Sequence, residues 1–154
     1  MKSIAGNQKL HTLTATQKLV DPNSSNDARA IAITVSAPSV HVGNIQGRAD
    51  TSTVGSWSAI VVITAHDAKH NPLNGVTVHG NWNGSSGDST CVTSDAGGGG
   101  AGTCSVVLSG DANYSRWASF AVTALTRSGY LYKSSANHDP DGSSNGFSII
   151  FRRN

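Results

Sequence analysis

Apolar and polar residues alternate with a period of two along several segments of this chain, and this alternation constrains the fold more than any other feature. From Trp57 to Ala65 every second residue is apolar, and the intervening positions are polar toward both ends of the segment. Successive side chains of a β-strand point to opposite faces, so such a segment buries one face. The same spacing recurs over 76–82 and 117–125. All three segments are predicted to be strands.

Turn-forming residues separate these segments from shorter apolar runs at 90–93, 104–108 and 147–151. Asn71-Pro72 and Asn74-Gly75 mark a chain reversal, because Pro fixes φ and Asn-Gly tolerates positive φ. The chain contains 17 Gly and no Glu, and no run has the apolar spacing of a helix. Short strands at such intervals are typical of an all-β protein, either a β-sandwich or a small barrel.

Length and charge exclude several classes of protein. A chain of 154 residues has room for one full core. The net charge is +2 and the cations are scattered singly, so no basic face for nucleic acid is expected. The longest apolar stretch, residues 59–63, is too short for a membrane span. The start of the chain lacks the apolar core of a signal peptide, so any export signal is expected to have been removed already.

A partial internal repeat suggests two parts in the chain. An Asp-Pro turn leads into an apolar run over residues 21–35, and the same arrangement recurs over 139–151. Residues 1–38 are therefore predicted to be an N-terminal strand arm or the tail of a preceding repeat, and residues 39–154 the sandwich domain. Strands of the arm need a partner sheet, from another copy by strand exchange or from a neighbouring repeat. The alternative is that residues 1–38 are a fragment boundary or the first strands of one larger sandwich.

The two cysteines flank a glycine-rich loop. Cys91 and Cys104 lie on the predicted strands before and after residues 95–102, and a hairpin would place them opposite one another. We predict a disulfide, which contributes on the order of 3 kcal/mol by closing a loop of about 15 residues. It would place the protein outside the reducing cytosol. The alternative is a pair of buried thiols in a cytosolic protein.

Residues 61–78, with their Asp-Ala-Lys-His-Asn-Pro turn, resemble the bacterial immunoglobulin-like repeats of the invasin/intimin type, as do residues 93–108. Over residues 39–154 the chain is similar to accessory immunoglobulin-like modules of secreted bacterial hydrolases and surface proteins. The resemblance implies an immunoglobulin-like antiparallel β-sandwich with an N-terminal strand extension, in an extracellular or cell-surface setting. Such modules serve as spacers, adhesins and binding domains, so the resemblance implies no single function.

Two groups of residues have spacings found at metal sites. Asp139, Asp141 and Asn145 place oxygen donors around a glycine turn, as Ca²⁺ loops do, and we predict them as candidate Ca²⁺ ligands. The alternative is a metal-free Asx turn. His66 and His70 have the spacing of a zinc-binding helix, but on a strand followed by a turn they are not expected to converge. We interpret them as ordinary turn histidines.

The sequence shows no catalytic machinery. It has no Gly-x-Ser-x-Gly elbow, and the close carboxylate pair at residues 139 and 141 has no second acid nearby in the sequence. The predicted function is therefore a non-enzymatic extracellular structural or adhesion module, self-assembling through its N-terminal strands. The alternative is a carbohydrate-binding accessory domain of a secreted hydrolase, in which Tyr114 and Trp117 stack on the sugar of a polysaccharide.

Overall fold

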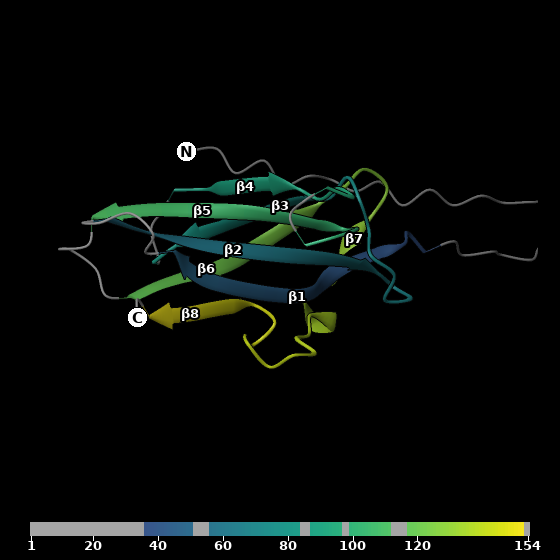
Figure 1. The fold of residues 1–154 in the computed structure, drawn as a ribbon. Coiled ribbons are helices and arrows are strands. Elements are labelled where there is room, and N and C mark those ends of the chain that lie inside the picture. Colours follow the sequence, from purple (N-terminus) through teal and green to yellow (C-terminus); the bar gives the residue numbers. More distant parts are fainter. Residues whose placement is uncertain (1–35, 51–55, 84–86, 97–98, 112–116, 153–154) are drawn as a thin grey trace, which may run out of the picture. The chain divides into compact units, whose positions relative to one another are not determined.

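Two four-stranded β-sheets make up the described part of the chain (Figure 1). The computed structural model describes residues 36–50, 56–83, 87–96, 99–111 and 117–152. Sheet A has the strand order β5-β2-β1-β7, and sheet B has the order β4-β3-β6-β8. The strands are β1 (Ser39–Asp50), β2 (Ser56–Asp67), β3 (Thr77–Trp82), β4 (Ser89–Val92), β5 (Thr103–Asp111), β6 (Trp117–Thr126), β7 (Leu131–Tyr132) and β8 (Ser148–Arg152).

The alternating apolar residues form the core between the two sheets, which confirms the predicted all-β sandwich. Val61, Ile63 and Val78 are fully buried, and Val122 is nearly so. Burying each such side chain contributes about 1.5–3 kcal/mol. Trp82 of β3 packs on Phe120 of β6 with ring centroids 5.0 Å apart. The inward residues therefore hold the sheets together, and the outward residues are left for other contacts.

Sheet A is built around the long antiparallel pair of β1 and β2. The segment β1 was not predicted as a strand, although it contributes Val40, Val42 and Ile45 to the core. On its other side β7 pairs with β1 in parallel, at Ser39 and Val40. Residues 133–147, which join β7 to β8, continue along this side of β1, and we call them the strap. The strap contains the single helical turn of the described residues, the 3-10 helix η1 (Ser134–Ala136).

A disulfide joins Cys91 to Cys104, with their Cα atoms 5.7 Å apart, as predicted. Of the expected hairpin, one antiparallel bridge forms, between Ser94 and Thr103, but the strands that carry the cysteines do not pair with one another. Cys91 lies on β4, which pairs with β3 in sheet B, and Cys104 lies on β5, which pairs with β2 in sheet A. The disulfide therefore links the two sheets to one another.

The chain divides into two compact units, Met1–Ser36 and Ala37–Asn154. The predicted N-terminal strand arm lies in the first unit and outside the described residues, so strand exchange stays a prediction. Among the residues that the structure describes, no helix is long and apolar enough to cross a membrane.

Candidate metal centre

Four histidines from four different segments converge on the outward face of sheet A. They are His41 of β1, His66 of β2, His70 of the turn after β2, and His138 of the strap. One ring nitrogen from each lies within 4.8 Å of the others. We call this group the four-histidine cluster.

The register of the two central strands places the first pair. His41 and His66 are directly opposed in the β1–β2 ladder, and their neighbours Val40, Val42 and Ala65 point into the core. Opposed residues of an antiparallel pair share a face with their Cβ atoms about 4.5–5.5 Å apart. Gly43 lies beneath this pair, and a Cβ atom there would overlap the imidazole of His66. A residue without a side chain is therefore needed at this point of β1.

The turn after β2 brings His70 back to this pair. One carboxylate oxygen of Asp67 accepts hydrogen bonds from the backbone N–H groups of Lys69 (2.8 Å) and Asn71 (2.9 Å). His70 has a φ of 63°, in the left-handed region that non-glycine residues rarely occupy. Its Nδ1 lies 3.3 Å from Nε2 of His41, within hydrogen-bond distance, so the tight turn places this ring in the cluster.

The strap supplies the fourth ring. The backbone N–H of His138 donates to the carbonyl of Val42 on β1 (3.1 Å). Its Nδ1 donates to the carbonyl of Ala136 (3.2 Å), which leaves Nε2 with a free lone pair in the neutral ring. Metal-binding histidines almost always have one ring nitrogen held by a carbonyl or carboxylate in this way.

Burial and mutual repulsion keep the inner rings in the form that binds metals. His41 is 1% exposed. Burial, followed by the nearby rings of His138, His70 and His66, lowers its pKa to about 4. Burial and two of the same neighbours also lower the pKa of His66. Both rings are therefore neutral at physiological pH, as metal ligation requires.

Two buried nitrogen atoms of the cluster have no hydrogen-bond partner among the described residues, Nδ1 of His41 and Nδ1 of His66. Buried polar atoms are nearly always satisfied, and an exception calls for an explanation such as an ion. Imidazole nitrogens bind Zn²⁺ at about 2.0–2.1 Å, which in a tetrahedron separates the ligand atoms by about 3.4 Å. The four ring nitrogens, all within 4.8 Å of one another, are close to that spacing.

The expectation that His66 and His70 do not converge is wrong, because the Asp67 turn reverses the chain between them. Their ring centroids are 6.2 Å apart. His41 and His138 were not predicted as site residues. A signal was available for His41, since it alternates with the apolar residues Val40 and Val42 and so lies on an outward face. For His138 we find no signal in the sequence.

The predicted Ca²⁺ loop forms a network of turn hydrogen bonds. Asp141 accepts from the side chains of Asn44 (3.0 Å) and Gln46 (2.6 Å), and these bonds lower its pKa. Asn145 accepts from two backbone N–H groups, and Asp139 accepts from one while its Oδ1 is buried without a partner. These contacts match the Asx-turn alternative, and Ca²⁺ binding here stays a prediction.

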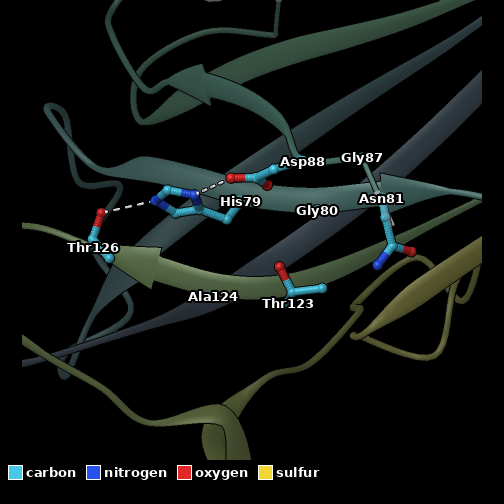
Figure 2. Close-up of a pocket in the computed structure, with 8 residues that line it drawn as sticks. All are labelled: His79, Gly80, Asn81, Gly87, Asp88, Thr123, Ala124 and Thr126. Atoms are coloured by element: carbon cyan, nitrogen blue, oxygen red, sulfur yellow. Dashed lines mark hydrogen bonds and ion pairs between the residues drawn. The ribbon is translucent and has the colours of Figure 1, made fainter. Parts of the chain in front are cut away.

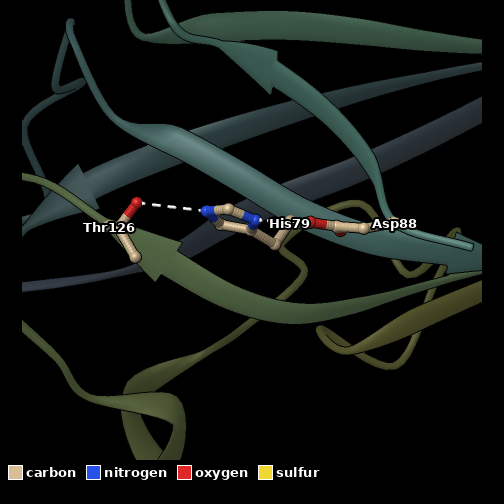
Figure 3. A network of polar contacts seen from close by, with 3 residues as sticks. All are labelled: His79, Asp88 and Thr126. Atoms are coloured by element: carbon tan, nitrogen blue, oxygen red, sulfur yellow. Dashed lines mark hydrogen bonds and ion pairs between the residues drawn. The ribbon is translucent and has the colours of Figure 1, made fainter. Parts of the chain in front are cut away.

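The outward face of sheet B carries a different polar group (Figure 2). A cavity of about 380 Å³ lies over β3 and β6 and is lined by polar side chains that include Asn81 and Thr123. At one end His79 donates from Nδ1 to Asp88 (2.8 Å), and its Nε2 lies 3.2 Å from the hydroxyl oxygen of Thr126 (Figure 3). Both ring nitrogens of His79 therefore have partners on neighbouring segments.

Of the two residues predicted to bind sugar, the structure describes Trp117 but not Tyr114. Trp117 begins β6 and is 51% exposed, on the same face of that strand as Thr123. Tyr114 lies outside the described residues. The structure therefore offers one aromatic side chain on this face for stacking on a sugar ring.

No protein-family model, no curated protein and no solved structure matches this chain at a significant level. The resemblance to invasin/intimin-type repeats therefore stays a prediction. The function has to be argued from the geometry of the four-histidine cluster and of the cavity on sheet B.

Proposed function

We propose that this chain is a non-enzymatic β-sandwich module that binds one Zn²⁺ ion through His41, His66, His70 and His138. The observation that carries the proposal is the meeting of four ring nitrogens from four separate segments. Nε2 of His41 and Nδ1 of His70 lie within hydrogen-bond distance of one another, but among the described residues Nδ1 of His41 and Nδ1 of His66 are buried without a partner. A cation that accepts four nitrogen ligands would bind the one ring nitrogen of each histidine that faces the centre of the cluster.

The number of ligands points to a structural site. Catalytic zinc sites have three protein ligands and keep a fourth position open for water, whereas structural sites use four protein ligands. Four histidines fill the coordination shell and leave no position for a substrate. Imidazole also suits Cu²⁺ and Ni²⁺, and Cu²⁺ generally binds more tightly to a given set of nitrogen ligands. A tetrahedral arrangement of the four nitrogens would select Zn²⁺ over Cu²⁺, which prefers a tetragonal one, and we propose that arrangement here.

The setting that we propose for this module is extracellular. The disulfide between the sheets supports it, because such bonds persist in oxidising compartments. An adhesion or spacer role fits a domain whose proposed metal site has no open coordination position. Self-assembly through the N-terminal strands belongs to this proposal and rests on the partial repeat in the sequence.

Calorimetry on the full chain, first stripped with EDTA, tests the proposal. Titration with Zn²⁺ is expected to show one ion bound per chain. At a Zn²⁺ concentration 100 times the Kd, binding stabilises the fold by about 2.7 kcal/mol and raises the Tm by roughly 10 °C. Co²⁺ in place of Zn²⁺ is expected to show the intense visible absorption of a tetrahedral site.

The control is His79→Ala, which removes a histidine from the other sheet and leaves the cluster intact. It is expected to bind Zn²⁺ as the unaltered chain does. Absence of binding to the unaltered chain, or equal loss of binding in His79→Ala and His66→Ala, contradicts the proposal. A weak octahedral Co²⁺ spectrum contradicts the four-histidine shell.

A second candidate function is carbohydrate binding on the outward face of sheet B. It is favoured by the exposed ring of Trp117 on the strand that also lines the polar cavity. An aromatic ring beside polar groups suits a sugar, which has apolar faces and hydroxyl edges. Retention on insoluble polysaccharide is expected to fall in Trp117→Ala and to be unchanged in His66→Ala. Equal retention of all three proteins contradicts this candidate.

A further inference from the structure

The side of β1 that faces away from β2 is covered in an unusual way. Pairing with β7 ends after Val40, although β1 runs on to Asp50. Beyond Val40 the strap takes the place of a neighbouring strand. Its backbone makes one hydrogen bond to this stretch, from the N–H of His138 to the carbonyl of Val42. Uncovered strand edges readily pair with other chains, so the hold of the strap decides whether this edge is protected.

At its start the strap makes a further backbone hydrogen bond to β1, from the N–H of Lys133 to the carbonyl of Val40 (2.9 Å), and its remaining hydrogen bonds to β1 use side chains. The N–H of Val42 donates to Oδ1 of Asn137 (2.9 Å), and the hydroxyl of Ser143 donates to the carbonyl of Ile45 (2.9 Å). Asp141 accepts from two side chains of β1, and these last bonds are exposed. Water competes for exposed side-chain hydrogen bonds, so their net contribution is small.

The four-histidine cluster adds a stronger connection at the same place. His138 belongs to the strap, whereas His41, His66 and His70 belong to β1, β2 and the turn that follows β2. An ion bound by all four therefore joins the strap to sheet A. Without an ion, the rings of His41 and His138 lie beside one another with centroids 5.2 Å apart.

We propose that Zn²⁺ at the four-histidine cluster is the latch that holds the strap over the edge of β1, and that loss of the ion frees the strap. This inference rests on the proposed function, because it requires Zn²⁺ to bind at this cluster. It goes further in assigning His138 a separate role from the other three ligands. His138 couples occupancy of the site to coverage of the strand edge.

The size of the effect follows from mass action. We assume that the strap opens only when His138 leaves the ion. Zn²⁺ then lowers the equilibrium constant for opening, and amide exchange in the strap slows by the same factor. At 100 times the Kd this factor reaches about 100 for an opening that abolishes binding. Three remaining ligands retain part of the affinity, so we expect at least about tenfold slower exchange.

Hydrogen–deuterium exchange of the full chain, stripped with EDTA and then with Zn²⁺ added, measures this factor. We expect slowing of at least tenfold in peptides covering 137–143 and at the amide of Val42, which donates to the strap. Amides of β3 in sheet B serve as the internal reference and are expected to change less. Zn²⁺ binding is measured by calorimetry on the same samples.

Two variants separate the latch from ordinary packing. In His138→Gln, Zn²⁺ is expected to bind more weakly, and at a saturating concentration it no longer slows exchange in the strap. In Asn137→Ala, the metal-free strap exchanges faster, but Zn²⁺ still slows it by at least tenfold. If Zn²⁺ binds and strap exchange stays the same, or if His138→Gln is protected as fully as the unaltered chain, the latch is wrong and the proposed function stands. Absence of Zn²⁺ binding to the unaltered chain overturns both.

Discussion

The outward faces of the two sheets each carry a group built around histidine, and the groups differ in how the ring nitrogens are satisfied. On sheet B, His79 has a partner at each nitrogen, Asp88 and Thr126. On sheet A, His41 and His66 each have a buried nitrogen with no partner in the part of the chain that the structure describes. A satisfied histidine closes a local network, whereas a group of unsatisfied histidines needs a further ligand. The unmet bonding capacity of the rings, more than their number, distinguishes a metal site from a polar contact.

The two groups also differ in how far solvent reaches their side chains. The side chain of Asp88 is 54% exposed, so water screens its interaction with His79. His41 is enclosed, and burial is the first cause of its lowered pKa. The same residue type is therefore a surface hydrogen-bonding group on one sheet and a buried, proposed metal ligand on the other.

The largest expected effect comes from removing one ring on each face. His66→Ala is expected to weaken Zn²⁺ binding more than 100-fold, because loss of a direct ligand should exceed the 10–100-fold cost of losing an outer partner. His79→Ala is expected to leave the affinity within about twofold of its original value. Isothermal titration of both variants measures the difference, and similar losses in the two would abolish the distinction between the faces.

The next effect concerns the glycine beneath the cluster. Gly43→Ala is expected to displace the ring of His66, weakening Zn²⁺ binding by roughly 10–100-fold and destabilising the metal-free fold by about 1–3 kcal/mol through overpacking. The double variant Gly43→Ala/His66→Ala is the control, because the overlap disappears with the ring. A stability cost of Gly43→Ala that persists in the His66→Ala background, measured by denaturant unfolding, would show that the ring is not its cause.

A smaller effect is expected for the exposed ligand in the turn. His70→Asn keeps a residue that tolerates positive φ, so the turn is retained while the imidazole is lost. Because His70 is the exposed member of the cluster, water can take its coordination position, so Zn²⁺ affinity is expected to fall by only about tenfold, with the free energy of unfolding of the metal-free protein changed by less than about 1 kcal/mol. Unchanged affinity would reduce the site to three histidines.

The smallest effect is expected on sheet B. Asp88→Asn removes the charge opposite His79, and exposed pairs of this kind contribute about 0.2–1 kcal/mol. Urea unfolding is expected to show a change within that range, and Zn²⁺ binding is expected to be unaltered. A cost of several kcal/mol would mean that the group on sheet B is more strongly coupled to the fold than its exposure indicates.

The sequence predicted those parts of the fold that depend on local alternation. The segments that became β2, β3 and β6 were identified from their two-residue period, and their inward residues are buried. The pairing of β4 and β5 was not predictable in the same way. Alternation shows which face of a strand is buried but not which strand lies beside it, so two cysteines on different sheets fitted a hairpin equally well.

The metal centre was harder to predict because most of its geometry is non-local. His66 and His70 were placed on a strand followed by a turn, and a chain reversal was predicted here, but the return of His70 to the strand through the turn closed by Asp67 was not foreseen. The approach of His41 depends on the register of β1 with β2, and that of His138 on the path of the strap. A Ca²⁺ loop was easier to propose because all of its candidate ligands are close in sequence.

The disulfide and the four-histidine cluster lie toward the same end of the sandwich, since Cys104 pairs with Ile63 and His66 follows on the same strand. His41 comes soon after Ala37, where the second unit of the chain begins. A pulling force that enters the domain at Ala37 reaches β1 at this end first. A bound ion would then resist separation of β1 from β2 and from the strap at that end. The disulfide between the sheets would be a second crosslink nearby, so the force needed to unfold the domain would depend on whether the ion is bound.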